Sequence, residues 1–264
     1  MSTSFETDVI IVGGGPSGTS TALSLLQFSD LKVVILEQTD LNFLRVGEQV
    51  NASIFDLLDY LNISKNDFTE NCFLPGYDSL AVWGTSNISS RHSIFNTQID
   101  SYQLDRESFD LLLLQKAAER GAIILPRIKI IEFKQDDCNH WLFRVMHQTK
   151  KDILIKAKYL VDASGRQSIV SRKIGATILK FDELIAIGSF FHYKNDEQIK
   201  QEVLLETAEY GWWYLATLPN NQIVCSLFTD ATIAKELQLQ KSKNWSSVLS
   251  DTRYLAFIKI SFLV

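Results

Sequence analysis

Residues 8–18 read DVIIVGGGPSG, and this stretch decides the fold. Four apolar residues lead directly into Gly13, Gly15 and Gly18, and an apolar segment with helical spacing follows over residues 19–28. This is the order of a buried strand, a tight turn and a helix. Gly13 allows the turn, Gly15 lets the backbone approach a pyrophosphate, and Gly18 lets helix and strand pack closely. The stretch therefore predicts a dinucleotide-binding βαβ unit.

A second predicted strand, residues 32–36, ends at Glu37. A carboxylate at this place can accept hydrogen bonds from both hydroxyls of an adenosine ribose, and it favours a ribose without a 2′-phosphate. The helix entered through Pro16 and Ser17 adds N–H groups and a partial positive charge for the phosphates. On these residues alone the dinucleotide is either NAD or FAD.

The composition is that of a globular protein. The chain has 264 residues, of which 46% are hydrophobic and 22% charged, enough for one large domain or two modest ones. A net charge of -5 gives no general attraction to nucleic acid, so we expect no such partner. Cys72, Cys138 and Cys225 lie far apart, and the histidines lack metal-ligand spacing. We predict neither a disulfide framework nor a metal site.

Neither end of the sequence resembles a membrane or export signal. The N-terminal MSTSFETD lacks the basic start and apolar core of a signal peptide. The apolar stretch at residues 254–264 is about half the length that spans a bilayer, and it contains Lys259. We interpret it as a core strand or an aberrant tail. A cytoplasmic protein without a membrane partner is expected.

Periodicity divides the rest of the chain into helices and short strands. Ile54, Leu57, Leu58 and Leu61 have the spacing of an amphipathic helix. The other predicted helices are residues 109–120 and 168–174, with a helix-like stretch at 233–249; the predicted strands are residues 80–83, 93–99, 122–125, 128–133, 141–147, 152–157, 159–162, 184–192, 202–206, 212–218 and 223–228.

These patterns predict an α/β fold in two interleaved parts. Residues 1–175 form a Rossmann-like nucleotide-binding domain, with an inserted segment at about 62–103 and a β-meander at about 128–157. Residues 176–264 change to long strands with little helix, which predicts a separate mixed β-sheet domain.

Four motifs follow one another: the glycine turn with Glu37, RVGE at residues 45–48, LDR at 104–106 and VDASGR at 161–166. Over nearly the whole chain this arrangement resembles the FAD-dependent monooxygenases with the p-hydroxybenzoate hydroxylase fold and the adjoining flavin-dependent halogenases. The resemblance implies FAD, held by a Rossmann-like domain of the GR2 type that is interleaved with a β-sheet substrate domain. GWWYLATLP at residues 211–219 looks most like the single-component flavoproteins that hydroxylate a tryptophan of a partner protein during maturation of a quinone cofactor.

The resemblance also implies roles for individual residues. Arg106 matches an arginine that reaches the FAD pyrophosphate, and Arg45 a residue near the adenosine ribose. Glu48 matches a loop close to the flavin ring. The full set implied or expected to bind the cofactor is Gly13, Gly15, Pro16, Ser17, Gly18, Glu37, Arg45, Gly47, Glu48, Arg106, Asp162 and Gly165. No catalytic base is identified; Glu48 by motif, and Trp212 and Tyr214 by position, are the candidates.

The implied function is hydroxylation of an aromatic, tryptophan-like substrate through a C4a-hydroperoxyflavin. The substrate is an aromatic small molecule or a tryptophan of a partner protein, and the electrons come from NADH or a flavin reductase. Halogenation is disfavoured on two grounds. The spacing of Trp212, Tyr214 and Pro219 departs from the W-x-W-x-I-P motif of the halogenases. Halogenases also require a lysine in a strand after the Gly-Glu loop, where residues 77–80 contain none.

Three alternatives stay open: a flavin-dependent halogenase, a geranylgeranyl-reductase-like enzyme, and an inactive flavin-fold protein that only binds a partner. The family carries a later G-D motif, which this sequence lacks. We therefore expect a truncated C-terminus and an incomplete substrate domain.

Overall fold

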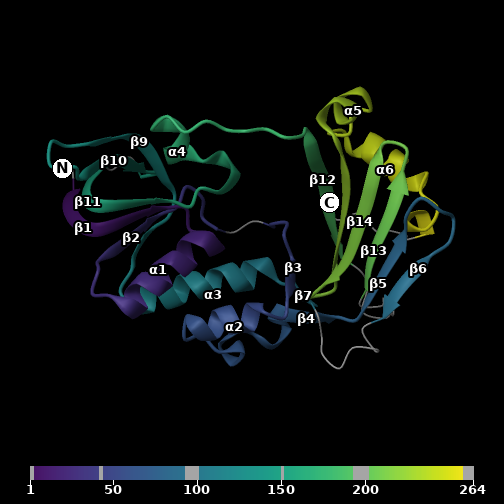
Figure 1. The fold of residues 1–264 in the computed structure, drawn as a ribbon, viewed down its shortest axis with the longest axis horizontal. Coiled ribbons are helices and arrows are strands. Elements are labelled where there is room, and N and C mark those ends of the chain that lie inside the picture. The colour runs from purple at the N-terminus through teal and green to yellow at the C-terminus, as the bar shows by residue number, and fades with distance from the viewer. Residues whose placement is uncertain (1–2, 42–43, 93–100, 150–151, 193–201, 258–264) are drawn as a thin grey trace. The chain divides into compact units, whose positions relative to one another are not determined.

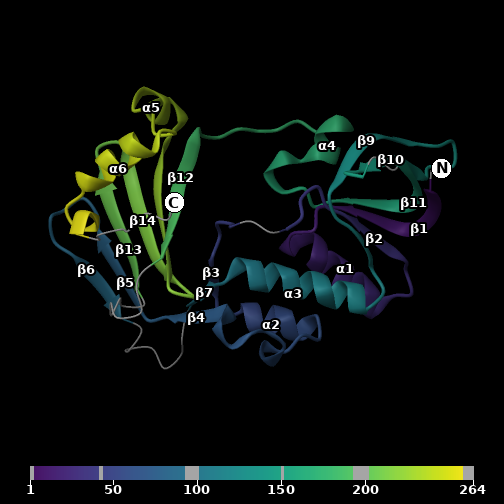
Figure 2. The ribbon, with the colours of Figure 1, turned by 180° about the vertical axis from the view of Figure 1, so that it is seen from behind.

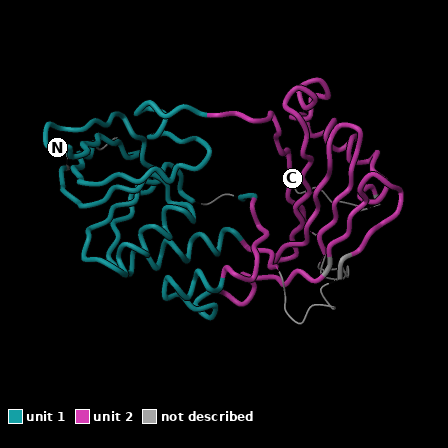
Figure 3. Tube along the Cα trace, viewed as in Figure 1, with its two compact units in different colours: residues 1–46, 55–68, 106–178 teal, residues 47–54, 69–105, 179–264 magenta. Residues whose placement is uncertain are grey.

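The computed structural model describes residues 3–41, 44–92, 101–149, 152–192 and 202–257. The chain forms two compact units, coloured separately in Figure 3. Unit 1 contains residues 1–46, 55–68 and 106–178, and unit 2 contains residues 47–54, 69–105 and 179–264.

A six-stranded sheet forms the centre of unit 1 (Figure 1). Its order is β8 (Ile123–Leu125), β2 (Val33–Leu36), β1 (Thr3–Val12), β11 (Asp152–Asp162), β10 (Trp141–His147) and β9 (Ile128–Gln135). The first four strands run parallel, and β10 and β9 add the antiparallel meander. The strands predicted at 152–157 and 159–162 are one continuous strand, because β1 pairs with both halves of β11.

Helices cover both faces of this sheet (Figures 1 and 2). Alternate residues of β1 point to opposite faces, as in any strand. Ile11 lies against α1 (Pro16–Phe28), and α3 (Arg106–Glu119) packs beside α1. Ile10 and Val12 join a buried cluster with the meander and with Val170 of α4 (Ile169–Lys173) on the other face. The short helix α2 (Ile54–Tyr60) lies beside α3 in both views.

Unit 2 is built on a second sheet of six strands. Its order is β12 (Leu184–His192), β15 (Gln222–Asp230), β14 (Gly211–Leu218), β13 (Glu202–Ala208), β5 (Asp78–Val82) and β6 (Ser89–His92). A small sheet adds β3 (Gln49–Asn51), β7 (Ser101–Leu104) and β4 (Phe73–Gly76). The predicted strand at residues 93–99 falls outside the described residues.

One face of the larger unit 2 sheet carries a hydrophobic core. Trp213, Leu215 and Leu227 are buried there against Trp245 of α6 (Ser242–Ser250). The helix-like stretch predicted at 233–249 is two helices, α5 (Ala231–Glu236) and α6, because the chain turns between them through Gln238 with a positive φ of 53°. The apolar stretch from Tyr254 begins with a 3-10 turn, Leu255–Phe257, and its remainder lies outside the described residues.

The predicted domain division differs from the two observed units at two segments. The inserted segment was placed in the first domain, but residues 69–105 belong to unit 2, because β5 pairs in parallel with β13. Residues 47–54 belong to unit 2 as well, since β3 pairs with β7. Among the described residues, no helix has the length and apolar character that crossing a bilayer requires.

Candidate nucleotide-binding site

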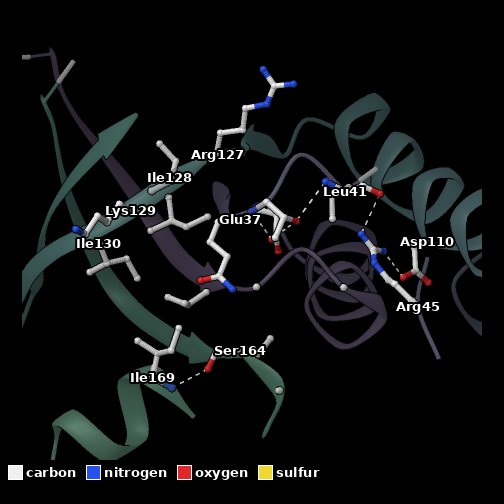
Figure 4. Close-up of a pocket in the computed structure, with 18 of the residues that line it drawn as sticks. Glu37, Leu41, Arg45, Asp110, Arg127, Ile128, Lys129, Ile130, Ser164 and Ile169 are labelled. Carbon is white, nitrogen blue, oxygen red and sulfur yellow. Dashed lines mark hydrogen bonds and ion pairs between the residues drawn. The ribbon is translucent and has the colours of Figure 1, made fainter. Parts of the chain in front are cut away.

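A cavity of about 880 Å³ lies in unit 1 (Figure 4). Its walls come from the turns that follow β1, β2 and β11, together with residues of the meander. These turns leave the carboxyl ends of parallel strands, which is where open α/β sheets bind their ligands. The volume falls within the range of cofactor and small-molecule pockets.

The glycine turn forms one wall of this cavity. Gly13 has a φ of 115°, and a Cβ there would overlap the carbonyl of Ala163 in the turn after β11. A Cβ on Gly18 would overlap the carbonyl oxygen of Gly13. A Cβ on Gly15 would meet no atom within 4 Å, and Gly15 lines the cavity. Gly13 and Gly18 are thus required by packing inside the protein, whereas Gly15 faces open space.

Glu37 closes the turn from the end of β2. Glu37 is 8% exposed, and its Oε2 accepts a hydrogen bond from the backbone N–H of Gly14 at 2.7 Å. Oε1 accepts from the backbone N–H and the hydroxyl of Thr39, at 2.8 and 2.7 Å. The carboxylate therefore fixes the glycine turn against the chain that follows β2. Glu37 also lines the cavity. Its contact with a ribose stays a prediction.

Two predicted arginines meet at a carboxylate that the sequence analysis did not single out. Arg106 donates from Nε and Nη2 to the two oxygens of Asp110, at 3.1 and 3.0 Å. Arg45 donates from Nη1 to Oδ2 of the same residue, and Figure 4 shows the two side chains facing each other. All three residues line the cavity. Asp110 lies four residues after Arg106, a helical spacing that is visible in the sequence.

Asp162 shapes the turn after β11 instead of lining the cavity. Its carboxylate accepts hydrogen bonds from the backbone and hydroxyl of Ser164 and from the backbone and hydroxyl of Ser171. Burial raises the pKa of Asp162, but these hydrogen bonds outweigh it and hold the pKa below its ordinary value. The turn held in this way contributes Ala163, Ser164, Gly165 and Arg166 to the cavity wall.

Other predicted residues lie in unit 2 and form a separate cluster. Glu48 is 5% exposed, and its charge acts on Tyr214. Burial and the negative charge of Glu48 raise the pKa of Tyr214. Trp212 instead stacks on Phe228, with ring centroids 5.3 Å apart. The structure thus brings Glu48 and Tyr214 together and gives Trp212 aromatic neighbours.

The predicted cofactor-binding residues divide between the cavity wall and places outside it. Gly13, Gly15, Pro16, Glu37, Arg45, Arg106 and Gly165 line it, whereas Ser17, Gly18, Gly47, Glu48 and Asp162 do not. Wall residues that the sequence analysis missed include Gln38, Thr39, Leu41, Asp110, Arg127, Ile128, Ile130, Met146, His147 and Gln148. Those of the meander are far from the motifs in sequence, so only the fold brings them to the site.

One group of potential metal ligands occurs in the described part of the chain, in the turn between β9 and β10. It consists of Asp136, Cys138 and His140. Oδ1 of Asp136 accepts the backbone N–H groups of Cys138 and His140, and Oδ2 pairs with Lys156 at 3.3 Å. Because both carboxylate oxygens already have partners, this group organises the hairpin.

The FAD binding domain family matches residues 6–243. The chain is 40% identical to LodB of Marinomonas mediterranea, which is named as an FAD-dependent oxidoreductase. The match extends over 249 residues and covers 94% of this chain and 67% of LodB. It is 24% identical to the 1H-pyrrole-2-carbonyl-[peptidyl-carrier protein] brominase of Pseudoalteromonas luteoviolacea, covering 90% of this chain and 57% of the brominase.

Solved structures show the same fold. The flavin-dependent halogenase CmlS superimposes with a TM-score of 0.79 at 22% identity, over 94% of this chain and 46% of that one. The myxobacterial chondrochloren halogenase CndH has a TM-score of 0.79 at 18% identity, over 95% of this chain and 59% of that one. The chain thus spans about half to two thirds of the proteins that it matches.

Proposed function

The chain belongs to the FAD-binding domain family, and from this premise we propose that it holds FAD in the unit 1 cavity and oxygenates an aromatic substrate. The observation that carries the proposal is the cavity wall itself. It combines an open glycine turn and a buried carboxylate, both at the carboxyl ends of parallel strands, with Arg45 and with Arg106 at the start of α3.

Each of these groups suits one part of the cofactor. The open space beyond Gly15 lets a pyrophosphate approach the backbone, and the N-terminus of α1 adds its partial positive charge. Arg45 and Arg106 supply cations whose planar forks suit phosphate oxygens. Glu37 offers carboxylate oxygens to ribose hydroxyls beside the turn that it already holds.

Bound FAD supplies the redox chemistry, which no side chain provides. Glu48 and Tyr214 are our candidates for handling protons during the reaction. Tyr214 is partly buried and its pKa is raised, so its hydroxyl stays protonated at neutral pH and can donate a hydrogen bond. Glu48, whose charge contributes to that shift, accepts hydrogen bonds in its ionised form.

We propose hydroxylation over halogenation because residues 77–80 contain no lysine and because residues 211–219 depart from the W-x-W-x-I-P motif of halogenases. Halogenation is the second candidate, because a brominase and flavin-dependent halogenases are among the similar proteins. The proposed substrate is an aromatic small molecule or a tryptophan of a partner protein, with NADH or a flavin reductase as the electron source.

Mass spectrometry separates these candidates. The protein is loaded with FAD and supplied with NADH or a flavin reductase, oxygen, bromide and a tryptophan-containing peptide. We expect the peptide to gain one oxygen atom and no bromine, and free tryptophan serves as the small-molecule comparison. A brominated product would replace hydroxylation by halogenation. A chain that binds FAD but does not consume oxygen with either electron source would favour a binding protein.

A further inference from the structure

Asp110 is the most deeply buried charged group in the wall of the nucleotide cavity. Its side chain is 2% exposed, compared with 12% for Arg45 and 17% for Arg106. An isolated carboxylate at such a position is costly, and it is stable only when it is paired and hydrogen-bonded. Asp110 therefore needs the arginines, and the arginines in turn are held by Asp110.

The contacts fix both guanidinium groups. Arg106 donates hydrogen bonds from Nε and Nη2 to Asp110, and its third nitrogen, Nη1, donates to the carbonyl of Val46 at 2.7 Å. Arg45 donates from Nη1 to Asp110 and from Nη2 to the carbonyl of Leu41 at 3.1 Å. One carboxylate thus ties the start of α3 to the segment after β2, and it sets the planes of two cations at the cavity.

Two guanidinium groups share the single carboxylate of Asp110 in this cluster. Without Asp110, the two like charges would repel each other and lose the anchor that sets their orientation. The fork of an arginine recognises phosphate by its geometry as well as by its charge, so lost orientation weakens phosphate binding.

We propose that Asp110 is a positioning residue that presents Arg45 and Arg106 together to the diphosphate of the nucleotide. The proposal rests on the proposed function, since it assumes that the cavity takes a nucleoside diphosphate. Removing the negative charge of Asp110 makes the cavity more positive, which by Coulomb's law alone would strengthen anion binding. Positioning requires the opposite result.

The test compares ADP with adenosine by isothermal titration calorimetry on the full chain. We expect Asp110→Asn to bind ADP about tenfold or more weakly, as loss of a charge-assisted phosphate contact requires, while adenosine binding changes less than about twofold. Asp40→Asn is the matched control, because Asp40 lies between Thr39 and Leu41 of the same wall and pairs with Arg127 at 3.8 Å. It removes the carboxylate that pairs with Arg127 and leaves Asp110 in place, so its ADP affinity should be equal or tighter.

The outcomes separate the inference from its premise. Unchanged or tighter ADP binding by Asp110→Asn, or an equal loss of ADP and adenosine binding, would overturn the positioning role. A wild-type protein that binds neither ADP nor FAD would instead overturn the proposed function. If Asp110→Asn does not fold, Asp110→Glu replaces it. It keeps the charge but displaces the carboxylate, and the same selective loss of ADP binding is expected.

Discussion

Gly15 directly precedes α1 and Gly18 lies three residues later in its first turn, yet side chains at the two positions would meet different surroundings. The space around Gly15 is open, whereas the space at Gly18 is filled by the carbonyl of Gly13. A side chain at Gly18 must therefore displace backbone. At Gly15 it enters the cavity where the pyrophosphate is proposed to bind.

This contrast gives a prediction at the scale of single residues. Gly15→Val should fold, with a melting temperature close to that of the wild type, but it should not retain FAD. Gly18→Val should lose stability, by about 1–3 kcal/mol or more, because an overpacked backbone contact must relax. Visible absorption of the flavin and thermal unfolding measure the two effects. Equal flavin retention by wild type and folded Gly15→Val would contradict the assignment of this turn.

At the scale of elements, the connection from β11 to α4 depends on one carboxylate. Asp162 ends β11, and its oxygens accept hydrogen bonds from Ser164 at the turn and from Ser171 within α4. These donors favour the ionised form, so the pKa of Asp162 lies below its unfolded value. A carboxylate with a lowered folded pKa stabilises the protein above the unfolded pKa, about 3.9, and loses this contribution as the pH falls through the folded pKa.

We therefore predict a pH-dependent effect of Asp162→Asn. The variant should be less stable than the wild type at pH 7, and the difference in melting temperature should shrink as the pH falls below about 4. Ser171→Ala removes the hydroxyl donor but keeps the backbone donor, so it should show part of the same trend. A difference that stays constant from neutral pH to below the folded pKa would show that the carboxylate charge is not involved.

At the scale of the whole molecule, the last residues of β11 lack a partner strand on one side among the residues that the structure describes. Residues 152–157 of β11 pair with β1 and β10, but residues 159–162 pair only with β1 among the residues that the structure describes. Tyr159 in this segment is 59% exposed. A strand edge with exposed apolar side chains is a site for pairing with another chain.

Self-association through this edge can be tested with one charge. Tyr159→Lys places a cation on the open edge, which opposes strand pairing between copies. We expect the variant to stay monodisperse at protein concentrations at which the wild type forms larger species in light scattering. Tyr77→Lys is the control, because Tyr77 is also exposed but lies in unit 2, between β4 and β5. If both variants behave alike, or if the wild type is monodisperse throughout, the open edge is not an association site.

The sequence by itself determined the elements that depend on local physics. The turn at residues 13–18 is recognisable because a positive φ and close backbone contacts admit only glycine. The strand at residues 141–147 was predicted at its observed bounds, since alternation of apolar residues is a local property. The family motifs led to FAD, and the family match confirms that cofactor.

Only the tertiary structure decided which distant segments meet. Residues 69–105 were predicted inside the first domain, but pairing of β5 with β13 joins two strands more than a hundred residues apart, and local periodicity carries no information about such pairing. The same holds for Arg45 and Asp110, which lie 65 residues apart in the sequence and meet only in the folded chain. The glycine motif predicts a nucleotide site from the sequence alone. The contacts of Arg45 and Arg106 with the buried carboxylate of Asp110 form only when the chain is folded.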